Sequence, residues 1–304
     1  MENESMYWPN FYIVGAAKAG TTSVYAYLIK HPQVFIPKIK EPGYFLSVRP
    51  NPDAASKLYV GDLEGYQRLY KGAKGYEAIG DASTGYIFDR HAARSIHEVC
   101  PQARIVVLLR DPVARSYSQY FMFQRFGMER LSFAEAIRRD HSEMIEKNSW
   151  GGYFHELYVE LGLYYEQVRR YIEVFGRDQV EFFLHEDMAN DTPGVIGAIC
   201  RHIGVDPGLL SAEDLARIHN PGRVPRYEWL YNAARTVISF RLRDKVLPHR
   251  VKDWLGDSPW FYKRYKQQRD DESTRYLQSI YEPDICRLEE LLGRKFPQLR
   301  QTWI

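Results

Sequence analysis

The pattern of apolar residues along the chain predicts short buried strands that alternate with helices. Apolar runs rich in β-branched and aromatic residues predict strands at 11–14, 34–36, 78–81, 104–109 and 179–184. Apolar residues at helical spacing predict helices over 23–30, 63–70, 89–99, 112–126, 132–147, 153–175 and 192–203. Strands that alternate with helices form parallel sheets covered on both faces. We therefore expect an α/β fold with three layers and a central parallel sheet of about five strands flanked by helices.

The run 104–109 (RIVVLL) is the clearest strand, since it is apolar throughout, as a strand covered on both faces should be. In open sheets of this kind, ligands bind beyond the carboxyl ends of the strands. Polar residues follow four of the predicted strands at or near these ends: Lys18, Glu41, Asp81 and Arg110. We expect these four side chains to line one edge of the sheet.

The strand predicted at 11–14 leads into a loop of small residues with one lysine, AAKAGTT at 16–22, and then into a helix. A tight loop at a helix N-terminus makes an anion cradle, because free backbone N–H groups and the positive helix end meet there. The loop differs from a Walker A sequence, which places its lysine directly after the second glycine. Gly15 and Gly20 have the required separation, but Thr21 stands in the lysine position and Lys18 lies inside the loop. The alternative for this loop alone is an ordinary turn with one exposed lysine.

Residues 17–23 (AKAGTTS) resemble the 5′-phosphosulfate loop of sulfotransferases that use 3′-phosphoadenosine-5′-phosphosulfate (PAPS), in particular a bacterial branch related to the heparan-sulfate and other glycan sulfotransferases. The displaced lysine carries this resemblance. It implies a P-loop-like fold that binds PAPS, the sulfuryl donor, and no metal. The residues of the loop that it assigns to nucleotide binding are Ala17, Lys18, Ala19, Gly20, Thr21, Thr22 and Ser23.

A second segment, RDPVARSYSQY at 110–120, resembles the 3′-phosphate segment of the same family. There an arginine ends a strand and a serine follows eight positions later, as Arg110 and Ser118 do here. A guanidinium and a hydroxyl in these places can clamp one phosphate from two sides. The alternative is a surface salt bridge and a capping serine. Two anion sites on one sheet edge suit a nucleotide with phosphates at both ends, and the resemblance implies that this nucleotide is PAPS.

The segment KEPGYF at 40–45 resembles the Lys-Glu-Pro-x-aromatic-Phe segment of the family. The resemblance implies that Glu41 is the general base that takes a proton from the acceptor. It further implies that Lys40 assists on the sulfuryl oxygens and that Tyr44 contacts the acceptor. The alternative is a solvated Lys-Glu pair in a loop.

Two further segments are expected near the acceptor. The first, DASTGY at 81–86, resembles the Glu-Lys-Ser-Pro-x-Tyr segment of the glycan branch, which implies acceptor contacts from Asp81 and Ser83. Ala82 and Thr84 depart from that pattern, and the missing lysine weakens the case for a heparan-like polyanion. The second is WGGY at 150–153, where Tyr153 falls at a family Gly-x-Tyr near the acceptor pocket; a helix start is the alternative.

The segment HNPGRVPR at 219–226 resembles the late basic loop that closes over the nucleotide. The resemblance assigns four of its residues to nucleotide binding: Asn220, Gly222, Arg223 and Arg226. The alternative is a solvated loop. The helical pattern at 227–243 mixes apolar residues with arginines, which favours a core-packed helix with a basic outer face over a helix that touches a membrane surface.

The composition is that of an ordinary soluble protein, with 45% hydrophobic and 26% charged residues. A chain of 304 residues can bury a full core, and we expect one domain over 1–304. A net charge of +2 gives no overall signature of nucleic-acid binding, although 217–269 holds thirteen Lys/Arg against four Asp/Glu. Three widely spaced cysteines favour a reducing compartment. Because the first ten residues are polar and no apolar run reaches the length of a membrane span, we expect a cytoplasmic protein.

The family resemblance of these segments implies a PAPS-dependent sulfotransferase that moves a sulfuryl group to a hydroxyl or amine of a small-molecule or carbohydrate acceptor and releases PAP, the desulfated nucleotide. By analogy with phosphoryl transfer, we expect an in-line displacement. One rival is an ATP-dependent kinase of the P-loop class, which would need a lysine at position 21. The other is a non-catalytic nucleotide-binding or membrane-associated module, against which Glu41 beside Lys18 argues.

Overall fold

The structure is a computed structural model that describes residues 7–48, 60–125, 128–139, 141–147, 156–216, 223–225, 262–264 and 269–303. Its contacts divide the chain into two compact units, Met1–Arg217 with Arg269–Ile304, and Ile218–Gln268. The described part of the second unit is an antiparallel pair of strands, β6 (Arg223–Pro225) and β7 (Tyr262–Arg264). The single domain expected over 1–304 stays a prediction.

The first unit is built on a five-stranded parallel sheet, which confirms the predicted fold class. The strands are β1 (Phe11–Gly15), β2 (Val34–Phe35), β3 (Ala78–Ala82), β4 (Arg104–Leu109) and β5 (Val180–Leu184). Their order is β2-β3-β1-β4-β5, so β1 lies at the centre. Every residue of β1 and β3 is buried, as expected of strands covered on both faces.

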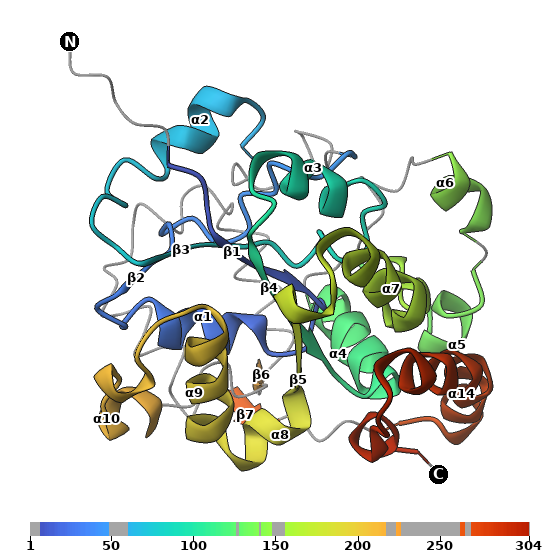
Figure 1. The fold of residues 1–304 in the computed structure, drawn as a ribbon. Helices are drawn as coiled ribbons and strands as arrows, with labels where there is room; N and C mark the ends of the chain where they lie inside the picture. The colour runs from blue at the N-terminus through green and yellow to red at the C-terminus, as the bar shows by residue number, and fades with distance from the viewer. Residues whose placement is uncertain are drawn as a thin grey trace, which may run out of the picture. The chain divides into compact units, whose positions relative to one another are not determined.

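Helices cover the sheet on both faces (Figure 1). On one side lie α1 (Thr21–Leu28) and α9 (Thr192–His202), and on the other lie α3 (Ala92–Val99) and α7 (Tyr164–Phe175). The remaining α-helices of the described residues are α2 (Leu63–Arg68), α4 (Pro112–Arg125), α5 (Phe133–Ala136), α6 (Ser142–Glu146), α8 (His185–Asn190), α10 (Ala212–Ala216) and α14 (Asp271–Leu292). Short 3₁₀ turns lie at Glu160–Gly162, Arg177–Gln179, Pro207–Leu209 and Pro297–Arg300.

Two predicted helices differ from the observed ones. In place of the helix predicted over 132–147 the structure has two short helices, α5 and α6, and α5 ends at Ala136. The helix predicted over 153–175 begins only at Tyr164, because Leu163 is extended and the backbone N–H groups of Tyr164 and Tyr165 donate to the carboxylate of Asp284 on α14. A distant residue therefore caps α7, which the local sequence does not reveal. The helical pattern at 227–243 lies outside the described residues.

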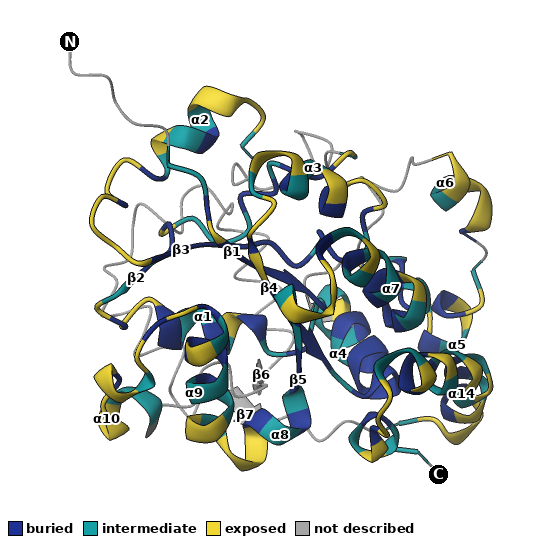
Figure 2. Ribbon diagram, viewed as in Figure 1, coloured by how far each residue is buried: buried dark blue, intermediate teal, exposed yellow. Residues whose placement is uncertain are grey.

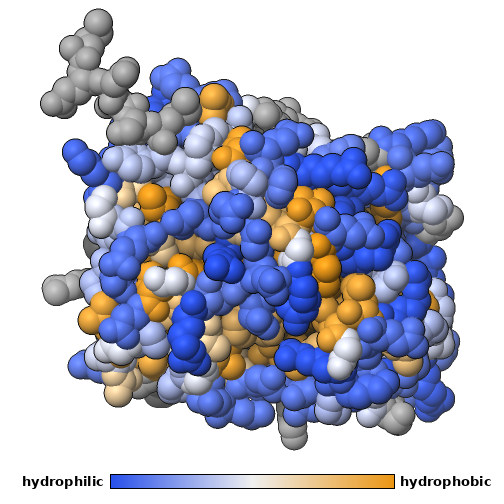
Figure 3. Space-filling view, in the orientation of Figure 1, coloured by the Kyte–Doolittle hydropathy of each residue, from blue (hydrophilic) through white to orange (hydrophobic). Residues whose placement is uncertain are grey.

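The core follows the sheet, and the helices around it have a buried side and an exposed side (Figure 2). The face drawn in Figure 3 is mostly hydrophilic with apolar residues interspersed, which is normal for a protein surface. None of the helices in the described part of the chain is long and apolar enough to cross a membrane.

Candidate active site

The loop between β1 and α1 leaves the N-terminus of α1 open to an anion. Gly20 is the N-cap residue of α1, no side chain caps the helix, and its first turn holds no acidic residue. By contrast, aspartates cap α2, α9 and α14 through their side chains. Uncapped N–H groups and the positive end of the helix dipole attract a phosphate or sulfate group. The described geometry of 17–23 is thus that of an anion cradle.

Gly20 has a left-handed backbone that only glycine adopts easily, with φ of 93°. A Cβ atom at this position would lie 2.7 Å from Met188 Cε and 2.8 Å from His185 Nδ1. The loop is therefore packed against the start of α8, and a side chain at position 20 would have to displace it.

Lys18 and Glu41 share an unusual backbone conformation. They are the two non-glycine residues with positive φ in the described part of the chain, at 70° for Lys18 and 62° for Glu41. Such conformations are uncommon outside glycine and cluster at functional sites. Lys18 follows β1, and the backbone N–H of Glu41 donates to Ala82 O at 3.1 Å, at the carboxyl end of the neighbouring β3. Both residues therefore lie at the same edge of the sheet.

Arg110 joins the two predicted phosphate segments. It follows β4, and its Nη1 donates to the carbonyl oxygen of Lys18 at 3.0 Å. Burial lowers the pKa of Arg110, and the charge of Glu186 opposes that shift. The Nε atom of Arg110 is buried and has no hydrogen-bond partner among the described residues. A half-buried guanidinium with an unused donor beside an anion cradle suits an anionic ligand.

Ser118 lies on α4 on the side that faces the loop. Lys18 Nζ donates to Met122 Sδ at 3.1 Å, and Ser118 is one helical turn before Met122 on the same face of α4. The structure thus brings together Lys18, Arg110 and the face of α4 that carries Ser118, as the sequence predicts. Their roles toward a nucleotide stay predictions.

The side chain of Glu41 is held by two neighbours and is partly exposed. Lys40 Nζ forms an ion pair with Glu41 Oε1 at 2.5 Å, and Thr84 Oγ1 donates to the same oxygen at 3.2 Å. The Glu41 side chain is 39% exposed and that of Lys40 is 19% exposed. Both contacts use Oε1, and none of the described residues is shown to bond Oε2, so this oxygen can accept a proton from a ligand.

Asp81 and Ser83 are buried, with 0% and 1% of their surface exposed. Their polar atoms bond protein groups: Asp81 accepts from three hydroxyl groups, and Ser83 Oγ lies between Asp81 and the backbone N–H of Gly43. Their predicted contact with the acceptor stays a prediction. In the described geometry Ser83 bonds the segment that follows Glu41 directly, and Asp81 is connected to that segment through the hydroxyls of Ser83 and Tyr86.

The sequence predicts that Tyr44 and Tyr153 contact the acceptor. The ring of Tyr44 stacks on Tyr66 of α2, with 4.5 Å between the centroids, and lies 6.3 Å from the ring of Trp8. Tyr44 is therefore part of an aromatic cluster. Tyr153 lies outside the described residues. So do Asn220, Gly222 and Arg226 of the predicted closing loop, while Arg223 is the first residue of β6 in the second unit.

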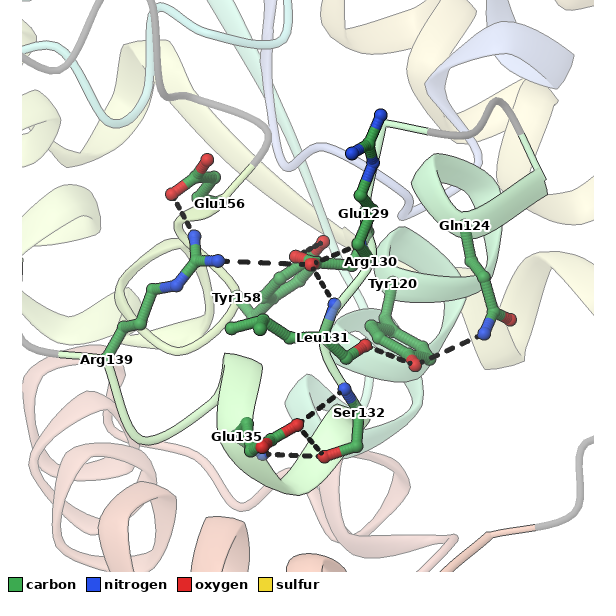
Figure 4. Close-up of polar contacts among 10 residues, drawn as sticks. All are labelled: Tyr120, Gln124, Glu129, Arg130, Leu131, Ser132, Glu135, Arg139, Glu156 and Tyr158. Atoms are coloured by element: carbon green, nitrogen blue, oxygen red, sulfur yellow. Dashed lines mark hydrogen bonds and ion pairs between the residues drawn. The ribbon is translucent and has the colours of Figure 1, made fainter.

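The segment that follows Tyr153 is anchored to the chain after α4 (Figure 4). Tyr158 donates to the buried Glu129 Oε2 at 3.0 Å, and Arg139 lies between Glu129 and Glu156 in the close-up. Glu129 Oε1 accepts from the backbone N–H groups of Arg130 and Leu131. This network fixes residues 129–131 and 156–158 to each other.

The sequence reasoning missed His185 and Glu186, which begin α8 directly after β5. Burial, and after it the charge of Arg110, lowers the pKa of His185 to about 4, so this imidazole is neutral at pH 7. Glu186 Oε1 accepts from the backbone N–H of Asp111 at 3.2 Å, and burial raises the pKa of Glu186. The signal for these two residues in the sequence is their place directly after a fifth strand, at the sheet edge where ligands bind.

The comparisons with known proteins agree with this geometry. The family model described as "Sulfotransferase domain" matches residues 9–221, which include the anion cradle, Glu41 and Arg110. The chain belongs to this family. The sulfotransferase is similar over 97% of its length to the crystal structure of a sulfotransferase from Alicyclobacillus acidocaldarius, with 28% identity, a TM-score of 0.70 and 99% of that chain covered.

Curated relatives match over smaller parts of the chain. The sulfotransferase is 30% identical to the membrane-associated sulfotransferase kil1 of Dictyostelium discoideum over 50% of this chain and 36% of that protein. It is 25% identical to human carbohydrate sulfotransferase 15 over 66% of this chain and 44% of that protein. It is 24% identical to human heparan sulfate glucosamine 3-O-sulfotransferase 6 over 65% of this chain and 53% of that protein. The chain thus spans about a third to a half of the length of these relatives.

Proposed function

We propose that this sulfotransferase moves the sulfuryl group of PAPS to a hydroxyl or amine of a small-molecule or carbohydrate acceptor and releases PAP. The observation that carries the proposal is the contact between Arg110 Nη1 and the Lys18 carbonyl at 3.0 Å. It joins an uncapped helix N-terminus to a half-buried guanidinium, so two anion-binding features lie side by side. A nucleotide with a phosphate at each end needs two such features at one place.

In this proposal, Lys18 and the N-terminus of α1 stabilise the negative charge that builds on the leaving phosphate. Arg110 and Ser118 hold the 3′-phosphate and so fix the orientation of the nucleotide. PAPS supplies the sulfuryl group, whose bond to the 5′-phosphate oxygen breaks as a bond to the acceptor oxygen or nitrogen forms.

Glu41 acts as the general base in this scheme. It takes the acceptor proton on the carboxylate oxygen that Lys40 and Thr84 leave unused. Lys40, already paired with Glu41, supplies positive charge near the sulfuryl oxygens. The similarity to a carbohydrate sulfotransferase and a heparan sulfate sulfotransferase supports an acceptor with hydroxyl or amino groups.

Turnover of labelled PAPS against a panel of glycans, glycolipids and small amines or alcohols tests the proposal. Label should move to at least one acceptor, and one PAP should form for each sulfuryl group transferred. Transfer of a phosphoryl group from Mg-ATP to the same panel, with no transfer from PAPS, would contradict it and favour the kinase.

A further inference from the structure

Asp81 is a fully buried carboxylate that takes no direct part in the proposed reaction. It lies in β3 with 0% of its surface exposed. Burial raises its pKa from 3.8 to about 6, while hydrogen bonds from Ser83, Tyr66 and Tyr86 oppose that shift. At pH 8 the group is therefore ionised, and a buried ionised carboxylate must be well hydrogen-bonded to persist.

Three hydroxyl groups donate to this carboxylate. Ser83 Oγ donates to Asp81 Oδ1 at 2.6 Å, and the hydroxyls of Tyr66 and Tyr86 donate to Oδ2 at 2.8 and 2.9 Å. An ionised carboxylate only accepts hydrogen bonds, so each hydroxyl must turn its hydrogen toward Asp81. The lone pairs of the hydroxyl oxygens then face away from Asp81.

Two of these hydroxyl oxygens accept from the backbone just after Glu41. Gly43 N donates to Ser83 Oγ at 3.1 Å, and Phe45 N donates to the hydroxyl of Tyr86 at 3.3 Å. The direction of each hydrogen bond is consistent with Asp81 as the final acceptor of two short series of hydrogen bonds, one through Ser83 and one through Tyr86. The carboxylate is thus connected, through one hydroxyl each, to two backbone N–H groups beyond Glu41.

The conformation of Glu41 itself makes such support necessary. Its φ of 62° is unfavourable for a residue with a Cβ atom, and strained conformations persist only where the surroundings impose them. The backbone N–H of Glu41 donates to Ala82 O, and Thr84 Oγ1 donates to the Glu41 carboxylate. With the bonds from Gly43 and Phe45, residues 82–86 therefore hold both ends of the segment 41–45.

We propose that Asp81 is a positioning residue for Glu41: its carboxylate orients the hydroxyls of Ser83 and Tyr86, which hold the segment that follows the base. The inference rests on the proposed function, which makes Glu41 the general base. It gives Asp81 no contact with the nucleotide or the acceptor.

Tyr66 provides a matched control. Its hydroxyl donates to the same Asp81 oxygen as Tyr86 does, but it accepts from the hydroxyl of Tyr70 at 3.3 Å and not from the segment 41–45. Y66F keeps the ring that stacks on Tyr44 and removes one hydrogen bond to Asp81. Y86F likewise keeps its ring and removes one hydrogen bond to Asp81, together with the acceptor for Phe45 N.

The experiment compares the parent with S83A, Y86F, D81N, Y66F and the conservative S83T. Three quantities are measured at pH 8: the amide hydrogen-exchange rates of Gly43 and Phe45, the affinity for PAP, and the rate of a single turnover of PAPS. We expect faster amide exchange at Gly43 in S83A, at Phe45 in Y86F and at both in D81N. In these three variants turnover should fall by about 10- to 100-fold, because a small misplacement of a catalytic group can cost that much. PAP affinity should stay within a few-fold of the parent.

S83T, which keeps the hydroxyl, should restore most of the rate, and Y66F should leave exchange at Gly43 and Phe45 close to the parent. The inference is overturned if Y66F slows turnover as much as S83A and Y86F, because the loss would then reflect stability alone. It is equally overturned if Gly43 and Phe45 exchange at parental rates in S83A and Y86F. If D81N does not fold, S83A and Y86F decide.

The experiment gives a different result if the proposed function, rather than the role of Asp81, is wrong. A folded parent that transfers no sulfuryl group to any acceptor contradicts that function and, with it, the role of Glu41. The exchange rates need neither acceptor nor turnover, so they still decide whether Asp81 orders the segment 41–45.

Discussion

At the scale of single residues, the account depends on side chains that meet at one sheet edge. Lys18 and Glu41 adopt left-handed backbone conformations there, and Arg110 bonds the backbone of Lys18. Each carries a charge that the proposed reaction needs: a cation at the leaving phosphate, a base at the acceptor and a cation at the 3′-phosphate. Because their roles differ, substitutions at these residues should affect the affinity for PAP and the rate of sulfuryl transfer separately.

Glu41→Gln should abolish the base and keep the shape of the side chain. Turnover of PAPS in a single-turnover experiment should fall by ~10²–10⁴-fold, the usual contribution of a positioned general base. The affinity for PAP should be close to that of the parent, since Glu41 contacts Lys40 and Thr84 rather than the cradle. Single turnover is required so that slow release of PAP does not mask the chemical step. Turnover within a few-fold of the parent would mean that the base lies elsewhere.

Arg110→Ala should remove a charge-assisted hydrogen bond to the 3′-phosphate, worth about 1.5–3 kcal/mol. Calorimetric titration should show this loss for PAP and little loss for AMP, which has no 3′-phosphate. If the substitution weakens the binding of both nucleotides equally, Arg110 supports the loop through its bond to Lys18 O and does not bind the 3′-phosphate.

At the scale of elements, the sequence predicted all five strands of the sheet, because buried parallel strands are continuous apolar runs between turn residues. It also placed the loop after β1 and the polar residue after β4 at one edge, since parallel topology brings carboxyl ends together. The prediction from sequence failed where residues distant along the chain determine the local structure. Asp284 of α14 sets the start of α7, and three hydroxyl groups make Asp81 a buried acceptor. Neither contact has a local pattern.

The loop between β1 and α1 should tolerate no side chain at position 20. Gly20→Ala and the control Gly204→Ala both place alanine at positive φ, of 93° and 83°, which costs about 1–2 kcal/mol each. At Gly204 the new Cβ atom meets nothing within 4 Å, whereas at Gly20 it meets Met188 and His185. We expect Gly20→Ala to lose about 1–3 kcal/mol more in urea unfolding and to bind PAP more weakly. Equal behaviour of the two variants would mean that the loop is not tightly packed.

At the scale of the whole molecule, the buried carboxylate of Asp81 affects how stability depends on pH. Its pKa is raised from 3.8 to about 6 on folding, so the folded state binds a proton that the unfolded state has released between these values. The contribution of Asp81 to stability is therefore greatest in acid and is lost as pH rises through about 6.

Asp81→Asn should remove this dependence. Between pH 7 and pH 5 the unfolding free energy of the parent should rise by about 1 kcal/mol relative to that of D81N. Asp284, whose pKa burial also raises to about 6, and His185 are present in both proteins and cancel in the difference. Urea unfolding at the two pH values measures it. A difference that is constant with pH would show that Asp81 does not titrate in this range.

The central claim is that one edge of the sheet binds a nucleotide with phosphates at both ends. The most direct test is the melting temperature of the parent protein with PAP and with Mg-ATP at equal concentrations. A ligand that binds only the folded state stabilises it, and at equal excess concentrations the tighter-binding ligand gives the larger increase in melting temperature. The account predicts a clearly larger increase with PAP than with Mg-ATP. An equal or larger increase with Mg-ATP would contradict it.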